Sequence, residues 1–212
     1  MKLLLTSAGW EYNGAIGKEF LRLVGKKPSE IKVFFVISPL KYPSREKYIS
    51  RLFNKFKAIK VPEKNITYFQ LDRKVSNKEL EGFDVVFVFG GNTFDYLDRM
   101  RKTGLDKLIK SYVKKGGVYV GLSAGSYLAC PTIEAATWKP GDRNFVKLVN
   151  LKGLNFVSFL VTAHFGRKYL SIIREASKNT KYPVIALTDK QAVVVEDADW
   201  KIVGSGRKNI FQ

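Results

Sequence analysis

The sequence predicts one α/β domain over residues 1–212, in which helices cover both faces of a mostly parallel sheet to give three layers. Short, continuously apolar segments alternate along the chain with segments whose apolar residues recur at helical spacing, as in repeated βα units. Residues 84–89, DVVFVF, are typical of a strand buried on both faces. The last apolar runs lie close together, which predicts antiparallel strands at the sheet edge near the C-terminus.

The same patterns predict the individual elements in chain order. Apolar runs predict strands at residues 2–6, 31–37, 66–71, 84–89, 118–120, 156–162, 184–187, 192–196 and 201–203. Helical spacing predicts helices at residues 15–24, 45–60, 94–101, 105–115 and 167–178, with a further helix directly after residue 123. We expect Ser44 to cap the helix at 45–60 and Ser76 to cap a short helical turn.

Composition limits the classes of function. The net charge is +18, but the basic residues are scattered and no run exceeds two, which favours a solvated lysine-rich surface over a specific nucleic-acid site. The positive field would also attract an anionic substrate. Cys130 is the single cysteine, so a cytoplasmic location is expected. No segment is apolar enough to span a membrane, and the first apolar run is too short for a signal peptide.

Residues 117–133 carry the strongest functional signal. An apolar run leads into Gly121-Leu122-Ser123-Ala124-Gly125, followed by small residues that can turn helical at once. A serine between two glycines at a strand-to-helix turn is the arrangement of a nucleophile elbow. The helix that follows points backbone N–H groups at developing negative charge. Ser123 is therefore a candidate nucleophile, although an ordinary glycine-rich turn shares the pattern.

A serine nucleophile needs a base and oxyanion donors. His164, the only histidine, lies just past an expected strand, where sites form in open α/β sheets. A neutral imidazole can accept the serine proton near neutral pH. The backbone N–H of Ala124 and of the Gly90-Gly91 turn are the candidate oxyanion donors, since glycine permits close backbone approach.

Three carboxylates could orient the histidine. Asp189 follows a strand beyond His164, where site loops gather, although aspartate is also common in hairpin turns. Glu134 and Asp142 would give the order Ser, acid, His of the α/β-hydrolases, but 48 residues of the 212 follow His164, whereas the hydrolase histidine lies near the chain end. A metal site is not expected, because the chain has no clustered ligands.

Three segments resemble the peptidase E, or aspartyl dipeptidase, family of serine peptidases, whose fold is akin to that of the class I glutamine amidotransferases. The segments are GGNTFDYL at residues 90–97, YVGLSAGSYLACPTI at residues 119–133, and the pair His164-Phe165. This resemblance implies that Ser123 is the nucleophile, that His164 is the base, and that Gly91 and Ala124 are the oxyanion donors.

The resemblance implies two alternative places for the acid. One is the loop after CPTI, where this chain has Trp138, which cannot serve. The other is a late loop, at or near Asp189. Because Trp138 occupies the first position, the resemblance favours Asp189 as the acid, with Glu134 as the remaining alternative. The resemblance also implies cleavage after an N-terminal aspartate, with Asn92 and Arg167 as substrate-binding residues.

We therefore expect a serine peptidase that hydrolyses short peptides, most of all dipeptides beginning with aspartate, through Ser123, His164 and Asp189 and without a cofactor or metal. A small peptide is the expected partner, no specific nucleic acid or membrane is expected, and a homodimer stays open. Two alternatives keep the fold: a peptidase like cyanophycinase, which cleaves an Asp-Arg polymer, and a non-catalytic binding or regulatory protein, which Trp138 keeps open.

Overall fold

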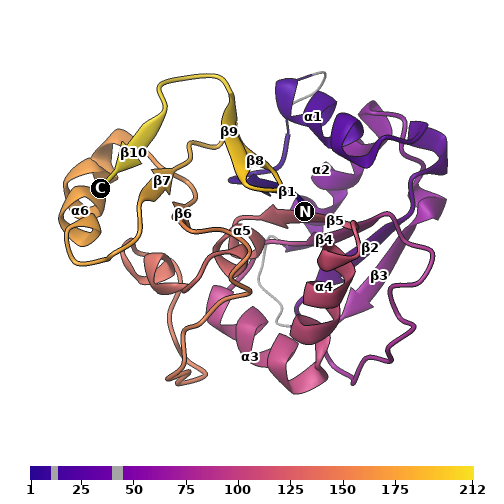
Figure 1. Ribbon diagram of the computed structural model, residues 1–212, viewed down its shortest axis with the longest axis horizontal. Coiled ribbons are helices and arrows are strands. Elements are labelled where there is room, and N and C mark those ends of the chain that lie inside the picture. Colours follow the sequence, from indigo (N-terminus) through magenta and orange to yellow (C-terminus); the bar gives the residue numbers. More distant parts are fainter. Residues whose placement is uncertain (11–13, 40–44) are drawn as a thin grey trace.

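The computed structural model describes residues 1–10, 14–39 and 45–212 (Figure 1). Its main sheet has seven strands in the order β3-β2-β4-β5-β1-β8-β9. The strands are β1 (Lys2–Thr6), β2 (Val33–Ile37), β3 (Ile66–Gln70), β4 (Val85–Val88), β5 (Val118–Leu122), β8 (Gln191–Glu196) and β9 (Asp199–Gly204). The first five of these are parallel, while β8 runs antiparallel to β1 and β9 antiparallel to β8. The predicted α/β class, with a mostly parallel sheet and antiparallel edge strands, is confirmed.

Helices cover both faces of this sheet (Figure 1). They are α1 (Ala15–Val24), α2 (Arg45–Ala58), α3 (Thr93–Thr103), α4 (Leu105–Lys114) and α5 (Ala124–Ala129). A further helix, α6 (Leu170–Ser177), lies away from this sheet, beside β7 and β10 (Figure 1). Successive residues of β1 face opposite sides, as the two-residue period of a strand requires. Leu3 and Leu5 pack into the core beneath α3, α4 and α5, and Leu4 packs into the core beneath α1 and α2.

A second, three-stranded sheet lies beside the main one, in the order β10-β7-β6. It consists of β6 (Leu160–Thr162), β7 (Val184–Ala186) and β10 (Asn209–Phe211), with β6 parallel to β7 and β10 antiparallel to β7. The sequence predicts β6 and β7 but gives no sign that they leave the main sheet, and it misses β10. The carboxyl ends of β6 and β7 lead into His164 and Asp189.

Four predicted elements need correction or fall outside the described residues. The strand expected at 156–162 is only β6, because the backbone N–H groups of Leu154 and Phe156 bond to carbonyls of Leu128 and Ala129 instead of a strand partner. The helix expected at 167–178 is a 3₁₀ turn, η4 (Arg167–Tyr169), followed by α6. The segment after Ser76 forms turns rather than a helix. Ser44, the expected cap of α2, lies outside the described residues.

Three further 3₁₀ turns complete the chain: η1 (Pro28–Glu30), η2 (Glu63–Asn65) and η3 (Glu134–Thr137). Across residues 1–10, 14–39 and 45–212, none of the helices combines the length and the apolar character that a membrane span requires.

Candidate active site

Ser123 lies in a sharp turn between β5 and α5, as the elbow pattern predicts. Its backbone has φ 51° and ψ −105°, a conformation that side-chain-bearing residues rarely adopt and that costs on the order of 1–3 kcal/mol. The turn is held from both sides: the Ser123 N–H donates to the Thr6 carbonyl oxygen at 2.9 Å, and the Ser123 carbonyl oxygen accepts from the Ser126 N–H at 2.8 Å. The surrounding structure therefore fixes the strained serine.

The two glycines of the motif allow α5 to approach the sheet. A Cβ added at Gly121 would lie 2.5 Å from the carbonyl oxygen of Gly125, and one added at Gly125 would lie 2.3 Å from the carbonyl oxygen of Val88. Both contacts are with backbone atoms, which cannot move aside to relieve the clash as the end of a flexible side chain could. The motif therefore requires glycine at both positions because of close packing.

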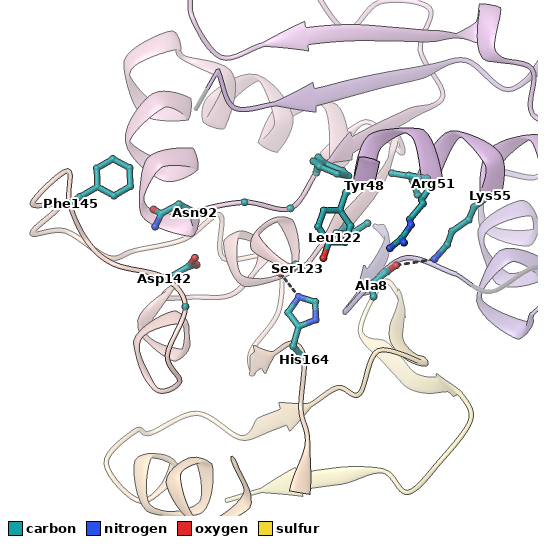
Figure 2. Close-up of a pocket in the computed structure, with 15 residues that line it drawn as sticks. Ala8, Tyr48, Arg51, Lys55, Asn92, Leu122, Ser123, Asp142, Phe145 and His164 are labelled. Carbon is teal, nitrogen blue, oxygen red and sulfur yellow. Dashed lines mark hydrogen bonds between the residues drawn. The ribbon is translucent and has the colours of Figure 1, made fainter. Parts of the chain in front are cut away.

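His164 follows β6 and reaches Ser123 across the gap between the two sheets. The distance between His164 Nε2 and Ser123 Oγ is 2.9 Å (Figure 2). The backbone of His164 is also in the left-handed region, at φ 54°. The neighbouring backbone is anchored, since the Ala163 N–H donates to the Tyr127 hydroxyl at 3.0 Å and the Phe165 N–H donates to the Leu187 carbonyl oxygen at 2.8 Å.

Asp189 lies in the turn between β7 and β8 and contacts the other nitrogen of the imidazole. The distance between Asp189 Oδ1 and His164 Nδ1 is 2.6 Å. The hydrogen bond with His164 lowers the pKa of the Asp189 carboxyl below its ordinary value, although partial burial opposes the shift. An ionised Asp189 places the proton of a neutral imidazole on Nδ1 and leaves Nε2 free to accept one.

Ser7 is a site residue that the sequence analysis misses. It follows β1, is fully buried, and donates from Oγ to Asp189 Oδ1 at 2.8 Å. Ser7 Oγ also accepts a hydrogen bond from the His164 backbone N–H at 2.7 Å. Ser7 thus joins the main sheet to both His164 and Asp189, the candidate base and acid. The available signal is its place at the end of a predicted strand, which Ser123, His164 and Asp189 share.

The other candidate acids do not contact His164. The Glu134 carboxylate accepts from the Thr180 hydroxyl at 2.7 Å. Asp142 Oδ2 accepts from the backbone N–H of Thr93 at 3.0 Å and from the Thr93 hydroxyl. Burial raises the pKa of Asp142 above its ordinary value. Trp138 is partly buried and packs against the core.

The Gly90-Gly91 turn after β4 lies against Ser123, the candidate nucleophile. A Cβ added at Gly90 would lie 3.4 Å from the Cβ of Ser123. Gly91 has φ 150°, which strains any residue with a side chain. Ala124 is the first residue of α5, where a backbone N–H has no carbonyl partner within the helix. The oxyanion-donor assignment of Gly91 and Ala124 stays a prediction that this arrangement supports.

A cavity of about 600 Å³ opens in front of Ser123 and His164. Figure 2 shows Arg51 and Lys55 of α2 on one side of the Ser123–His164 pair, and Asn92, Asp142 and Phe145 on the other. Asn92 also caps α3, since its Oδ1 accepts from the Asp95 N–H at 3.0 Å. Arg167, the other predicted substrate-binding residue, is exposed at the start of η4, and among the described residues it lines neither this cavity nor a smaller one that shares Ser123.

This arrangement can transfer a proton from a serine hydroxyl to an imidazole and hold the resulting imidazolium beside a carboxylate, which is the chemistry of acyl transfer. Within residues 1–10, 14–39 and 45–212, no three His, Cys, Asp or Glu side chains gather as a ligand set for a metal ion.

Comparison with protein families gives one extended match. The model of the family described as "Peptidase family S51" matches residues 3–203. An uncharacterised peptidase of Listeria monocytogenes is 33% identical over 107 residues, which is 48% of this chain and 52% of that protein. Peptidase E of Escherichia coli is 38% identical over 86 residues, 41% of this chain and 36% of that protein. The chain thus spans about half, or less, of the length of these curated relatives.

Solved structures that share the fold include two peptidases. A crystal structure of a candidate peptidase E from Listeria monocytogenes has a TM-score of 0.74 at 21% identity and covers 97% of this chain and 98% of its own. A peptidase from an acI-B1 actinobacterium has a TM-score of 0.60 at 15% identity, with coverage of 99% and 93%. Both likenesses are evidence for the fold alone.

Proposed function

The family match covers nearly the whole chain, so this protein belongs to peptidase family S51, and we propose that it is a serine peptidase that hydrolyses short peptides beginning with aspartate. One observation carries the proposal: Ser123, His164 and Asp189 form a continuous chain of hydrogen bonds, with distances of 2.9 and 2.6 Å. The preference for aspartate is supported by the resemblance of the GLSAG and LACPTI segments to the peptidase E, or aspartyl dipeptidase, family.

In the proposed mechanism, Ser123 Oγ attacks the carbonyl carbon of the first residue while His164 Nε2 takes the hydroxyl proton. The tetrahedral intermediate collapses, the C–N bond breaks, and His164 gives its proton to the leaving amine. An ester between the first residue and Ser123 remains. Water then attacks this ester with His164 as the base, which releases the free first residue and restores the serine.

The supporting groups have separate roles in this proposal. Asp189 orients His164 and stabilises the imidazolium. The backbone N–H groups of Gly91 and Ala124 bind the oxyanion, and loss of one such donor costs about 100- to 1,000-fold in rate. Asn92 contacts the substrate from the wall of the larger cavity. Trp138, the residue that keeps a non-catalytic alternative open, stands where the family can have its acid, and in this proposal Asp189 supplies the acid instead.

We also propose that the protein acts in the cytoplasm, because Cys130 is the only cysteine and is buried. Its sulfur accepts the Val161 N–H at 3.2 Å, and burial raises the pKa of the thiol to about 12, so the thiol is inert at neutral pH.

The proposed activity is tested with Asp-Leu and a set of other dipeptides. The wild-type protein should release free aspartate and react with a fluorophosphonate probe at Ser123. Ser123→Ala should abolish both signals. Ser171→Ala, which changes an exposed serine of α6, should retain both. Full peptidase activity in Ser123→Ala would overturn the assignment of the nucleophile.

A further inference from the structure

A second, smaller cavity adjoins the Ser123–His164 pair and carries opposite charges on its walls. Its volume is about 110 Å³, and Ser123, Asp142 and His164 line both it and the larger cavity. Lys139 and Tyr169 line only the smaller one. We propose that this smaller cavity binds the first residue of the substrate, with Lys139 pairing with its side-chain carboxylate and Asp142 accepting from its α-ammonium. This inference rests on the proposed peptidase function and adds the residues that select the substrate.

Lys139 is a half-buried cation on the wall of a cavity that has room for an anionic partner. Its Nζ donates to the carbonyl oxygen of Ala163 and lies 5.6 Å from the centroid of the Tyr169 ring. Among the described residues, no carboxylate lies within ion-pair distance of Lys139. An ammonium has three protons to donate, and a neutral carbonyl uses one of them. A substrate carboxylate would supply the charge that compensates for the burial of this ammonium.

Asp142 offers an unused acceptor in the same cavity. Both of its hydrogen bonds, from the Thr93 N–H and the Thr93 hydroxyl, go to Oδ2. Its other oxygen, Oδ1, has no hydrogen-bond partner within the described part of the chain. The bonds to Thr93 fix the carboxylate in place, so Oδ1 is pre-oriented to accept from a substrate ammonium. This leaves Asp142 with a binding role instead of the role of orienting His164.

The pairing of charges identifies the ligand. Only the first residue of a peptide has an α-ammonium close to the bond that Ser123 would cleave, and an aspartate there adds a carboxylate two carbons away. Arg51 and Lys55 line the larger cavity on the side away from Asp142, and we assign this cavity to the rest of the peptide and its terminal carboxylate. A volume of about 110 Å³ holds only a few waters, so the smaller cavity fits one short side chain.

The same arrangement explains rejection of other peptides. A first residue with a neutral side chain would leave the half-buried Lys139 ammonium without a carboxylate at ion-pair distance, and an acetylated amine would leave Asp142 Oδ1 without an ammonium donor. Leaving such groups unpaired is what gives a polar site strong discrimination. The inference therefore predicts that both charges of the ligand are required together.

The experiment is calorimetric titration of Ser123→Ala with L-aspartate, which needs no turnover. L-Aspartate should bind, whereas L-asparagine and N-acetyl-L-aspartate should each bind roughly 10- to 100-fold more weakly. Lys139→Met in this background should reduce L-aspartate affinity to the level of L-asparagine. Asp142→Asn, which can still accept from Thr93, should abolish the advantage of the free amine. Lys168→Met is the matched control, because Lys168 lies 4.9 Å from the same Tyr169 ring but outside the cavity.

Equal binding of L-aspartate and L-asparagine, or undiminished L-aspartate affinity in Lys139→Met, would overturn the inference. Lys139→Gln serves as a second variant if the methionine variant does not fold, with the thermal midpoint as the check. Fluorophosphonate labelling of the wild-type protein is measured separately. If the probe does not label Ser123 but the ligands bind as expected, the peptidase mechanism is refuted and the binding site stands. If the probe labels Ser123 but the ligands do not bind as expected, the binding site is refuted and the peptidase mechanism stands.

Discussion

The proposed nucleophile, Ser123, and its proposed base, His164, lie at the ends of strands in two different sheets, and different kinds of contact hold the two in place. Ser123 belongs to the seven-stranded sheet, where close backbone packing around Gly121 and Gly125 fixes the turn. His164 and Asp189 follow strands of the three-stranded sheet, and their side chains are 50% and 61% exposed. A few hydrogen bonds, two of them through Ser7, hold His164 and Asp189 in place. We call the turn around Ser123 the elbow half of the site, and His164 with Asp189 the base–acid half. Changes to the elbow half should therefore affect the stability of the fold most, and changes to the base–acid half should affect the rate of catalysis most.

The largest expected effect is on rate and comes from Asp189→Asn. The change removes the charge that orients His164, and we expect kcat to fall by about 10⁴-fold, as it does when the aspartate of a Ser-His-Asp triad is replaced by asparagine. The thermal midpoint should hardly change, because the side chain is 61% exposed. The measurement is the steady-state rate of Asp-Leu hydrolysis.

Glu134→Gln is the matched control for this prediction, because Glu134 contacts Thr180 instead of His164. It should keep a rate within about twofold of wild type. An unchanged rate in Asp189→Asn would show that Asp189 has no part in the mechanism. It would also contradict the expectation that changes to the base–acid half act mainly on rate.

The next effect is on stability and comes from Gly125→Ala. The added Cβ would lie 2.3 Å from the Val88 carbonyl oxygen, so α5 must shift, at a cost of about 3 kcal/mol in the free energy of unfolding. Gly166→Ala is the control in the other half, where nothing lies within 4 Å of the added atom, and its cost should be within about 0.5 kcal/mol. Urea denaturation measures both, and equal losses would contradict the packing argument.

Ser7→Ala tests the connection between the halves. The variant removes the hydrogen bond to Asp189 and the acceptor for the His164 N–H, so we expect kcat to fall roughly 10- to 100-fold with KM nearly unchanged. Ser126→Ala is the control, because this buried hydroxyl donates to the Thr6 carbonyl oxygen at 2.8 Å and contacts neither His164 nor Asp189. A similar loss of kcat in both variants would show that Ser7 has no specific role.

The smallest expected effect is the pH dependence of stability that Lys139 contributes. Burial lowers the pKa of Lys139 to about 8 in the folded protein, whereas an unfolded lysine has a pKa of about 10.4. Between these values the unfolded chain binds more protons, so the free energy of unfolding rises with pH. The thermal midpoint of wild type relative to Lys139→Met should therefore increase from pH 8 to pH 10, and a constant difference would contradict the burial of this ammonium.

The sequence predicts the elbow half better than the base–acid half, and the reason is physical. Close packing of α5 on the sheet requires glycine at two fixed positions around Ser123, so the site can be recognised from these two glycines in the sequence. His164 is identified because the chain has one histidine and that histidine follows an apolar run. Asp189 shares its residue type with many turns, and only its contact with His164 separates it from Glu134 and Asp142.

Other features depend on contacts between distant segments and leave no local pattern. Ser7 and Asp189 are 182 positions apart and meet because β1 pairs with β8. The split of β6 and β7 into a second sheet follows from strand pairing that apolar runs do not encode. Lys139 resembles any surface lysine in the sequence, and only the three-dimensional arrangement shows that it is half-buried and lines the same cavity as Ser123.

The central claim is that Ser123 forms an ester with the first residue of the substrate. Acid quenching of the protein mixed with aspartyl p-nitroanilide, followed by mass spectrometry of its peptides, tests this claim most directly. The account predicts an aspartyl adduct on the peptide that contains Ser123 and no adduct in Ser123→Ala. An adduct on another residue, or release of p-nitroaniline at the wild-type rate from Ser123→Ala, would contradict it.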